Sequence, residues 1–470
     1  MKKTKIIATI GPSCTNQNKI KNMIIEGMNV ARINMSHQYD LDDLKSVIKT
    51  IRDQSRLLDL PVAILFDLCG PKIRVDFQGR DEVMHIKKDE VLTVGNSRSD
   101  IPINMPIKFG EIQPGAYVKI DDGTLSFIVE SVQKTSLSIR SVSKGKIING
   151  KGINFPGVDL NVSTVTVKDI KDIRTAISLD IDWLAMSFVR SSDDILKVKE
   201  ILDSKDSSIP VIAKIEKPEA LDNLNNIVKS FDGILVARGD LGVEMPLSKL
   251  PLLQKQIVNK CLQHKKPVII ATQMLESMII SPNPTRAEVN DIANAIYDGV
   301  DAVMLSAETA IGKYPLESIK MMCSIAQEIE HDLDPLNFSR YIPKDTVRKS
   351  DRRSSICHAA MNISNDLDIK GIAVMTESGS TAIKMAQYRP NSHIYALCPY
   401  PDICRKLALI WGIIPILVEK YTSTDEMISN YISLLKDKEY IEQGDKVIIT
   451  AGVPIGISGT TNMIKVHVVD

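Results

Sequence analysis

Short apolar runs that recur at a nearly constant spacing constrain the fold of this chain more than any other feature. They lie at Lys5–Ile10, Asn29–Asn34, Val62–Asp67, Trp183–Phe188, Val211–Ile215, Gly233–Ala237, Val268–Ala271 and Ala302–Leu305. Each is rich in β-formers and ends at a polar, Gly or Pro turn, which is typical of buried parallel strands. Most of the spacings fit a strand–helix–strand unit, and eight such units make a (β/α)8 TIM barrel.

The fourth run arrives much later than this spacing allows, which indicates an insertion after the third. Within it, five strand-like segments occur, at Val83–Ile86, Glu90–Val94, Ala116–Ile120, Leu125–Val132 and Ser136–Val142. Turn signals such as Asp121-Asp122-Gly123 separate them, so we expect a small antiparallel β-barrel. Because barrel active sites lie on the βα loops, the insertion is interpreted as a lid domain.

A second strand–helix pattern begins after Pro335 and a charged connector. Strands are expected at Gly371–Thr376, His393–Leu397, Ile413–Val418, Lys446–Ala451 and Met463–Val469, which predicts a C-terminal open α/β sheet domain. The domain prediction is therefore a catalytic barrel from residues 1–72 and 161–343, a lid at 73–160, and an effector and oligomerisation domain at 344–470.

Composition excludes several classes of protein. Lys+Arg and Asp+Glu both number 58, and this balance argues against a partner that is nucleic acid or a membrane surface. The seven cysteines contain no CxxC pair, which fits a reducing compartment. No segment reads as a signal peptide, and the longest uncharged apolar stretch, 407–418, is too short to span a membrane. We expect a cytoplasmic location.

Most residues that the predicted barrel strands present at their C-terminal ends are polar or charged. They are Arg32, Asn34, Ser36, His37, Asp67, Ser187, Arg190, Lys214, Glu216, Arg238, Gly239, Asp240, Thr272, Gln273, Ser306 and Glu308. A single carboxylate there is usually a helix cap or a surface ion pair, and a single cation is usually solvated. Convergence of both signs at one mouth instead favours a hard divalent cation with an anionic substrate.

Several long strings then resemble those of pyruvate kinases, over essentially the whole chain. They are Thr4-Lys5-Ile6-Ile7-Ala8-Thr9-Ile10-Gly11-Pro12, Ala31-Arg32-Ile33-Asn34-Met35-Ser36-His37, Val211-Ile212-Ala213-Lys214-Ile215-Glu216-Lys217, Val236-Ala237-Arg238-Gly239-Asp240-Leu241-Gly242-Val243-Glu244, Ala271-Thr272-Gln273-Met274-Leu275-Glu276-Ser277-Met278 and Pro284-Thr285-Arg286-Ala287-Glu288. The resemblance implies transfer of the phosphoryl group of phosphoenolpyruvate to ADP, giving pyruvate and ATP in glycolysis.

The same resemblance implies a role for each matching residue. Glu216 and Asp240 would hold Mg²⁺, or Mn²⁺ in its place, and Lys214 would stabilise charge on the phosphoryl group and the enolate. Arg32 would bind the substrate phosphate, and Gly239 and Thr272 its carboxylate. Thr272 also lies on the proton-delivery side, but the proton donor stays open. The implied nucleotide contacts are Asn34, Ser36, His37, Arg74 and Lys151.

The sequence departs from the family around a monovalent cation site. Asn34, Ser36, Asp67 and Leu68 occupy the positions that surround K⁺ in K⁺-requiring members, but Lys72 replaces a glutamate nearby. An ammonium there would supply the charge of the ion, so we hypothesise that the enzyme does not need K⁺. The alternative, in which Lys72 points to solvent and K⁺ binds, stays open.

The C-terminal domain carries a hydroxyl-rich loop after its first strand. Thr376, Ser378, Ser380 and Thr381 resemble a phosphate cradle at a helix start, although such residues also cap ordinary helices. A second glycine-rich stretch lies at 452–459. In the resembling family this region binds a phosphorylated sugar or nucleotide that activates a homotetramer, so we expect an effector there and a homotetrameric assembly.

Two other functions are weighed against this one. An aldolase or lyase could stabilise a pyruvate enolate on Mg²⁺ with the same barrel. A catalytically inactive phosphate-sensing scaffold could keep the C-terminal cradle alone. The lid with Lys151 argues against the first, since an aldolase needs no nucleotide clamp. Intact Arg32, Lys214, Glu216, Asp240 and Thr272 argue against the second.

Overall fold

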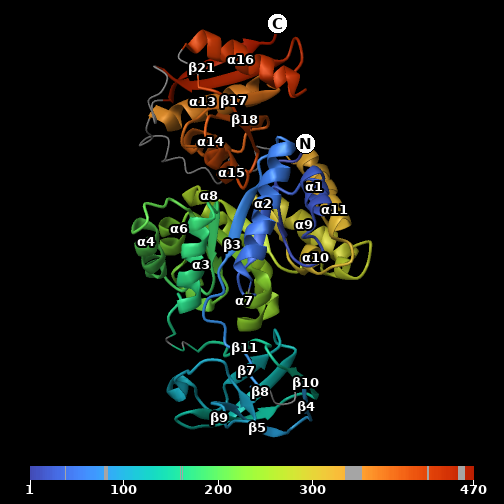
Figure 1. Ribbon diagram of the computed structural model, residues 1–470, viewed down its shortest axis with the longest axis vertical. Coiled ribbons are helices and arrows are strands. Elements are labelled where there is room, and N and C mark those ends of the chain that lie inside the picture. Colours follow the sequence, from blue (N-terminus) through green and yellow to red (C-terminus); the bar gives the residue numbers. More distant parts are fainter. Residues whose placement is uncertain are drawn as a thin grey trace.

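The computed structural model describes residues 1–37, 39–78, 83–158, 160, 162–333, 352–420, 423–453 and 461–470. Figure 1 shows three units along one long axis, with a barrel between a small β unit and a C-terminal α/β unit. The predicted boundary at 343 falls outside the described residues, and the other domain boundaries stay predictions.

Eight parallel strands close the central barrel. They are β1 (Lys5–Thr9), β2 (Val30–Asn34), β3 (Ala63–Asp67), β12 (Trp183–Met186), β13 (Val211–Ile215), β14 (Gly233–Ala237), β15 (Val268–Ala271) and β16 (Ala302–Leu305). The order around the barrel is β1-β16-β15-β14-β13-β12-β3-β2, so the first strand pairs with the last. The predicted barrel is confirmed, and every predicted strand lies within two residues of an observed one at each end.

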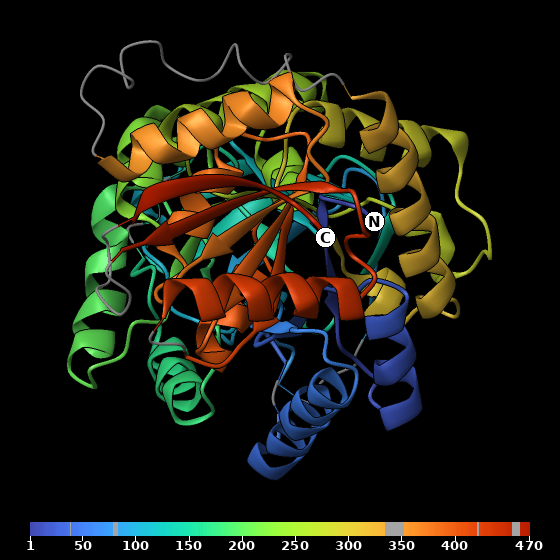
Figure 2. The ribbon, with the colours of Figure 1, turned by 90° about the horizontal axis from the view of Figure 1, so that it is seen from above.

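Helices ring the barrel, as the view along its axis shows (Figure 2). They are α1 (Gln17–Ile25), α2 (Leu41–Leu57), α3 (Val167–Ser178), α4 (Ile195–Asp203), α5 (Pro218–Asp222), α6 (Leu224–Ser230), α7 (Arg238–Glu244), α8 (Leu250–His264), α9 (Arg286–Tyr297), α10 (Ala307–Ala310) and α11 (Pro315–Asp332). Capping boxes start two of them, with Thr166 and Asp169 on α3 and Thr285 and Glu288 on α9. Both satisfy backbone N–H groups that the first helical turn leaves without partners.

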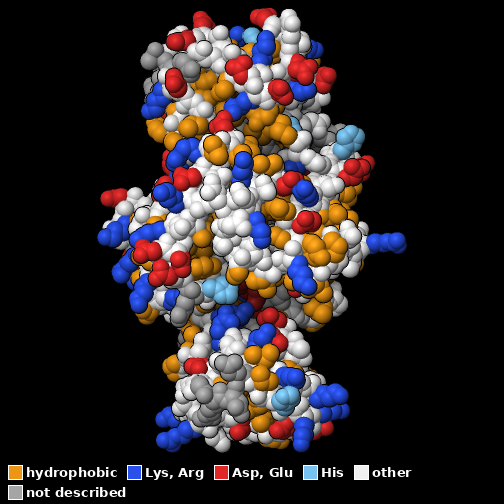
Figure 3. Space-filling model, turned by 45° about the vertical axis from the view of Figure 1, so that its right-hand side comes forward, with side chains coloured by type: hydrophobic (Ala, Val, Ile, Leu, Met, Phe, Trp, Pro, Cys, Tyr) orange, Lys and Arg blue, Asp and Glu red, His pale blue; other side chains and the backbone are white. Residues whose placement is uncertain are grey.

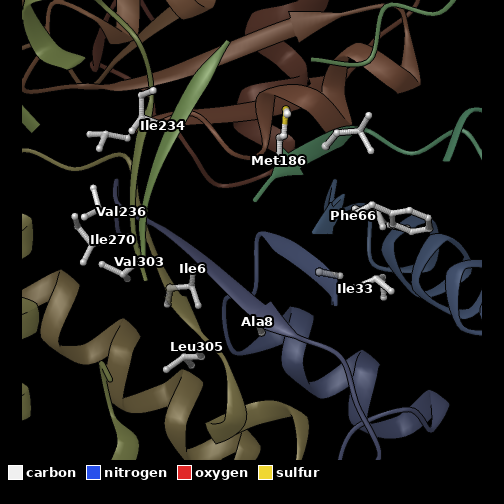
Figure 4. Close-up of a cluster of buried hydrophobic side chains, with 14 of the residues drawn as sticks. Ile6, Ala8, Ile33, Phe66, Met186, Ile234, Val236, Ile270, Val303 and Leu305 are labelled. Atoms are coloured by element: carbon white, nitrogen blue, oxygen red, sulfur yellow. The ribbon is translucent and has the colours of Figure 1, made fainter. Parts of the chain in front are cut away.

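The barrel strands are apolar on both faces because each face meets a different neighbour. Ile6 and Ala8 point outward into a layer shared with the helices, and Figure 4 shows this layer with Ile33, Phe66 and Val303. Ile7 belongs instead to the barrel interior, in a cluster that continues into the C-terminal unit. The strand alternation of two thus produces two separate cores.

The inserted unit forms two sheets around its own apolar core. Its strands are β4 (Val83–Ile86), β5 (Val91–Gly95), β6 (Ile101–Pro102), β7 (Tyr117–Ile120), β8 (Leu125–Val132), β9 (Ser136–Ser141), β10 (Gly145–Ile148) and β11 (Ile153–Asn154), with a 3-10 turn at Phe109–Glu111. Six strands run in the order β11-β7-β8-β9-β5-β6, and β10 pairs with β4. Their pairings are antiparallel except that of β5 with β6. We call residues 73–160 the lid.

The C-terminal unit is an open sheet between helices. Strands β17 (Gly371–Met375), β18 (His393–Cys398), β19 (Ile413–Leu417), β20 (Lys446–Gly452) and β21 (Thr461–Val468) lie in the order β19-β18-β17-β20-β21, with only β21 antiparallel. The helices are α13 (Arg352–Asp366), α14 (Ser380–Ala386), α15 (Pro401–Leu407) and α16 (Thr424–Asp437). The predicted open sheet is confirmed.

The C-terminal unit packs on the barrel floor, the end where the strands begin. Arg389 pairs with Asp301 at 3.0 Å, just before β16, and Arg405 donates to Asp182 at 2.8 Å, just before β12. The Nζ of Lys5 donates to the backbone carbonyl of Ile413. The lid therefore lies at the opposite end of the barrel, over the mouth (Figure 1).

All seven cysteines are free thiols. Among the described residues, no helix combines the length and apolar character that crossing a membrane would require.

Candidate active site

The barrel mouth brings four charged side chains into direct contact. Lys214, on β13, places its Nζ 3.1 Å from Oδ1 of Asp67 and 2.8 Å from Oε1 of Glu216. Beside these two ion pairs, Nζ donates a hydrogen bond at 2.7 Å to the hydroxyl of Ser187, which itself donates to the carbonyl of Leu68. Lys214 is 9% exposed, so its ammonium is held in place by three partners in a nearly dry site.

Arg32 completes this cluster from β2. Its Nε and Nη2 lie 2.8 and 2.7 Å from the same oxygen of Asp67, Oδ2. Its Nη1 donates to the hydroxyl of Thr9. Burial would raise the pKa of Asp67, but the neighbouring Lys214 and Arg32 outweigh burial and hold this pKa below its usual value. Asp67 therefore stays ionised and spaces two cations at the mouth.

The pKa values of Lys214 and Glu216 are shifted in directions that suit an ion site. Burial acts to lower the pKa of Lys214, but the carboxylates of Asp67, Glu216 and Asp240 outweigh burial. They raise this pKa above its ordinary value, so the ammonium stays charged. Burial and the nearby Asp240 raise the pKa of Glu216, against the opposing effect of Lys214. Two carboxylates that disfavour each other's charge gain from a cation placed between them.

The donor set fits a Mg²⁺ ion that keeps most of its ligands from water and substrate. Among the described residues, no three His, Cys, Asp or Glu side chains form a ready metal cluster. The carboxylates at the mouth that interact with each other are those of Glu216 and Asp240. Mg²⁺ in phosphoryl-transfer sites is usually bound by one or two carboxylates, so a pair is sufficient.

Three residues at the mouth hold left-handed backbone conformations that their side chains disfavour. Phe188, directly after β12, has φ 57°, and Thr272 and Gln273 after β15 have φ 70° and 54°. The turn at Phe188 aims its N–H at Oε2 of Glu216, at 2.7 Å. Strain of this kind persists where the surroundings enforce it, often at functional sites. Sequence reasoning missed Phe188, because an unfavourable φ leaves no mark on residue type here.

Thr272 and Gly239 meet across neighbouring strands. The N–H of Gly239 donates to the Thr272 hydroxyl at 2.7 Å, and this hydroxyl donates to the carbonyl of Ala271 at 2.6 Å. Arg238 donates to the carbonyl of Thr272 at 2.9 Å and pairs with Asp291. Arg238 therefore supports the turn, while Gly239 and Thr272 form one small polar patch.

The structure separates Glu308 from the charged cluster. Its two oxygens accept backbone N–H groups of Leu275, at 3.2 Å, and Ser306, at 2.7 Å. It is 1% exposed, so it braces the loops after β15 and β16. The expected helix-cap interpretation therefore describes this carboxylate better than a ligand role.

The expected nucleotide contacts divide between the barrel and the lid. On the barrel, the side-chain oxygen of Asn34 accepts the N–H of Ser36 at 3.1 Å, and His37 is exposed. On the lid, Arg74 is bridged to Gly152 and Lys151 pairs with Asp121 at 2.8 Å. Arg74 and Lys151 are thus neighbours, and no recorded ion pair or hydrogen bond in the described residues joins them to the barrel contacts.

Lys72 lies directly before the lid in the chain, and its side chain is partly buried against Asp240. Its Nζ is 3.3 Å from Oδ1 of Asp240, and its side chain is 22% exposed. A Cβ added at Gly152 would approach Cε of Lys72 to 3.0 Å, so the ammonium lies between the lid and α7.

The C-terminal loop is less concentrated than the mouth. The hydroxyls of Ser378 and Ser380 are 2.9 Å apart, and Arg353 donates to Ser380 at 3.0 Å. Thr376 and Thr381 are buried, and the hydroxyl of Thr381 bonds with that of Thr461. Residues 454–459 of the second glycine-rich stretch lie outside the described residues. Arg353 was not predicted, because a helix residue before the loop has no local link to it.

A (β/α)8 barrel whose mouth holds Lys214, Arg32 and paired carboxylates beneath a lid defines an enzyme that acts on a small anionic substrate. Comparison with known families sharpens this class. Residues 1–319 match the model "Pyruvate kinase, barrel domain", and residues 354–467 match "Pyruvate kinase, alpha/beta domain". The chain therefore belongs to the pyruvate kinase family and is a phosphotransferase.

Individual relatives agree with the family models. Pyruvate kinases of Staphylococcus aureus strains MRSA252 and USA300 are each 40% identical over 478 aligned residues, which is 100% of this chain and 81% of theirs. The crystal structure of a pyruvate kinase from Cryptosporidium parvum superposes with a TM-score of 0.92 at 32% identity, covering 100% of this chain and 96% of that one. The function is that of the family, phosphoryl transfer from phosphoenolpyruvate to ADP. This decides against the aldolase and the scaffold.

Proposed function

We propose that the charged cluster around Lys214 carries out the phosphoryl transfer, with Glu216 and Asp240 as the protein ligands of a Mg²⁺ ion. The carrying observation is the Lys214 ammonium held at 2.8 Å from Glu216 and 3.1 Å from Asp67. When bound, the divalent ion would neutralise charge on substrate oxygens; Mn²⁺ would serve similarly. The cluster is organised in advance, so it does not have to rearrange as charge develops.

Each substrate group has a matching donor. Arg32 would bind the phosphate of phosphoenolpyruvate, since its planar guanidinium suits phosphate oxygens. Gly239 and Thr272 would bind the carboxylate, exchanging their mutual 2.7 Å hydrogen bond for substrate. Lys214 would stabilise the transferring phosphoryl group and then the enolate oxygen. Thr272 stands on the side where the enolate must receive its proton, and the donor of that proton is left unassigned.

ADP would bind between the barrel and the lid. Asn34, Ser36 and His37 would contact it from the end of β2, and Arg74 and Lys151 from the lid. Lys151 is partly exposed and, among the residues that the structure describes, its ion pair is with Asp121 at the lid surface, so it is accessible to an anion. Closure of the lid would then bring its cations onto the nucleotide phosphates and exclude water.

We further propose that the enzyme works without K⁺, because Lys72 supplies the positive charge. The expected K⁺ ligands Asn34, Ser36, Asp67 and Leu68 lie next to the cluster, where Arg32 and Lys214 already neutralise Asp67. The contact of Lys72 with Asp240 keeps an ammonium at the mouth. Its position on Asp240 rather than on Asp67 means that it would act on the charge of the site as a whole.

The deciding assay measures pyruvate release from phosphoenolpyruvate, ADP and Mg²⁺ in buffer free of K⁺ and NH₄⁺. We expect activity without K⁺ to stay within about tenfold of the activity with KCl, whereas Lys72→Glu should gain more than about tenfold when KCl is added. Lys146→Glu, an exposed lid change, serves as the matched control. Activity that collapses more than tenfold without K⁺ would refute the Lys72 proposal while leaving the phosphotransfer assignment intact.

The Mg²⁺ proposal has its own readout in the same assay. Because the pKa of Glu216 is raised, its proton competes with the metal as the pH falls, so the Mg²⁺ concentration for half-maximal activity should rise toward acidic pH. Glu216→Gln should remove this dependence together with most activity. A Mg²⁺ requirement that does not change with pH would argue against Glu216 as a ligand.

We propose a phosphate-bearing effector, a sugar phosphate or a nucleotide, at Thr376, Ser378, Ser380 and Thr381, acting on a homotetramer. Support comes from the hydroxyls of Ser378 and Ser380, which bond to each other, and from Arg353, whose guanidinium donates to Ser380. A falling half-saturation for phosphoenolpyruvate on adding sugar phosphates or AMP, abolished in Ser380→Glu, is the expected result. A half-saturation for phosphoenolpyruvate that no compound changes, and that Ser380→Glu also leaves unchanged, would contradict the proposal. Sedimentation would report the assembly.

A further inference from the structure

Glu244, the last residue of α7, joins three separate parts of the molecule. Its Oε1 accepts hydrogen bonds from Nζ of Lys217 at 2.6 Å and from the side-chain amide of Asn154 at 2.9 Å. Lys217 follows Glu216 at the end of β13, whereas Asn154 belongs to β11 of the lid. The side chain of Glu244 is 1% exposed, so this junction lies inside the molecule.

The lid holds the same helix at other points. Lys119, on β7, donates to the carbonyl of Val243 at 2.6 Å. At the other end of the helix, Lys72 pairs with Asp240 at 3.3 Å. Lys72 lies where the chain enters the lid and Asn154 lies on its return strand. Both passages of the chain between barrel and lid therefore contact α7.

These polar contacts are not backed by close packing. A cavity of about 70 Å³ lies beside them, lined among others by Lys72, Asn154 and Lys217. Figure 3 shows the molecule narrowing between barrel and lid, with basic and acidic side chains at the constriction. Directional bonds at α7 therefore contribute to how the lid sits on the barrel, beside a cavity that leaves the apolar contact incomplete.

The helix that the lid contacts is the one that carries substrate-facing groups. Helix α7 has seven residues, Arg238–Glu244, and its first turn holds Gly239 and Asp240. A helix of two turns moves as a unit, so a shift at Glu244 is passed to Asp240. The expected nucleotide contacts Arg74 and Lys151 lie on the lid, at the other end of this connection.

We propose that Glu244 is a positioning residue that couples the lid to α7, so that nucleotide binding at the lid strengthens phosphoenolpyruvate binding at the mouth, and the reverse. Asn154 and Lys119 are its lid-side counterparts. The proposal rests on the assigned phosphotransfer reaction. Reciprocal coupling is required of any such link between two binding sites.

The test compares the KM for phosphoenolpyruvate at limiting and at saturating ADP. In the parent enzyme we expect this KM to fall at least about fivefold as ADP saturates, the lower end of ordinary coupling. Glu244→Gln, Asn154→Ala and Lys119→Met should each reduce the ratio to less than about twofold, with kcat changed by less than about threefold. Lys134→Met, on an exposed lid turn, is the matched control and should keep the parent ratio.

Three results would overturn the proposal: a parent ratio near one, variants that keep the parent ratio, or a Lys134→Met variant that loses it. The split between KM and kcat separates positioning from a general loss of structure, which would lower kcat as well. If Glu244→Gln leaves Lys217 without its partner and does not fold, Asn154→Ala decides, because it removes only the lid side of the link. Pyruvate release under saturating conditions shows independently that the phosphotransfer assignment holds.

Discussion

At the barrel floor, the C-terminal unit shares an apolar cluster with the barrel interior, and buried ion pairs such as that of Arg389 with Asp301 join the two units. At the mouth, Lys214 and Arg32 crowd around Asp67 and Glu216, three strained residues surround them, and a cavity separates barrel from lid. The contacts of the floor therefore serve the stability of the fold, whereas those of the mouth serve binding and movement of the lid. Barrel enzymes in general divide their two ends in this way.

The strongest way to break this comparison is to remove the central cation of the mouth. Lys214→Met should lower kcat by about 10³-fold or more, because preorganised charge at the reacting groups is lost. Urea unfolding should change far less than activity does, since Asp67 keeps Arg32 as a partner. Lys49→Met, exposed on α2, is the control. An active Lys214→Met enzyme would show that the charged cluster is structural.

At the floor the opposite pattern is expected. Arg389→Met leaves Asp301 buried without its cation and should cost about 3–5 kcal/mol of unfolding free energy. The turnover of the protein that remains folded should be unchanged, because Arg389 lies beyond the far end of the strands from the mouth. Equilibrium urea denaturation and kcat per folded molecule measure the two effects. Arg174→Met, exposed on α3, is the control and should change neither the unfolding free energy nor the turnover. A loss of turnover in Arg389→Met as large as its loss of stability would contradict the division between floor and mouth.

A smaller effect should appear in the pH dependence of the floor. Burial, aided by Lys2, lowers the pKa of Lys5 to about 7. Between pH 7 and 10.5 the unfolded chain binds this proton and the folded chain does not, so folding stability should rise with pH by up to about 1.4 kcal/mol per unit. Below pH 7 both states are protonated and the slope from this group vanishes.

Thermal or urea unfolding at pH 7, 8 and 9 tests this, with Lys5→Met as the comparison because it has no such proton. The difference between the two proteins should change in favour of Lys5 as the pH rises. Parallel stability curves would mean that the ammonium of Lys5 is solvated and that the floor is less dry than described.

Most of the fold could be predicted from the sequence, because strands of four or five apolar residues between turns carry a strong signal. Two strands of the lid were missed, β6 with two residues and β10 with one buried residue, because neither has a periodicity to detect. The charged residues of the mouth were also found, since they follow strands directly. Their partners were not, because the contacts of Lys72 with Asp240 and of Asn154 with Glu244 join residues far apart in the chain. Glu308 shows the opposite case. Its position at a strand end suggested a place in the charged cluster, but its carboxylate accepts backbone N–H groups instead.

The insertion of the lid between β3 and β12 also affects how the chain must fold. Leu65 pairs with Trp183 across the whole lid, and Lys5 pairs with Ala302 across nearly the whole barrel. During synthesis, β3 therefore has no partner on one side until β12 has been made, and β1 has none until β16 has been made. A lid that collapses early on its own core draws the ends of that long loop together and lowers the entropy lost when β12 docks. Destabilising the lid core, at Phe127 for example, should accordingly slow refolding of the barrel.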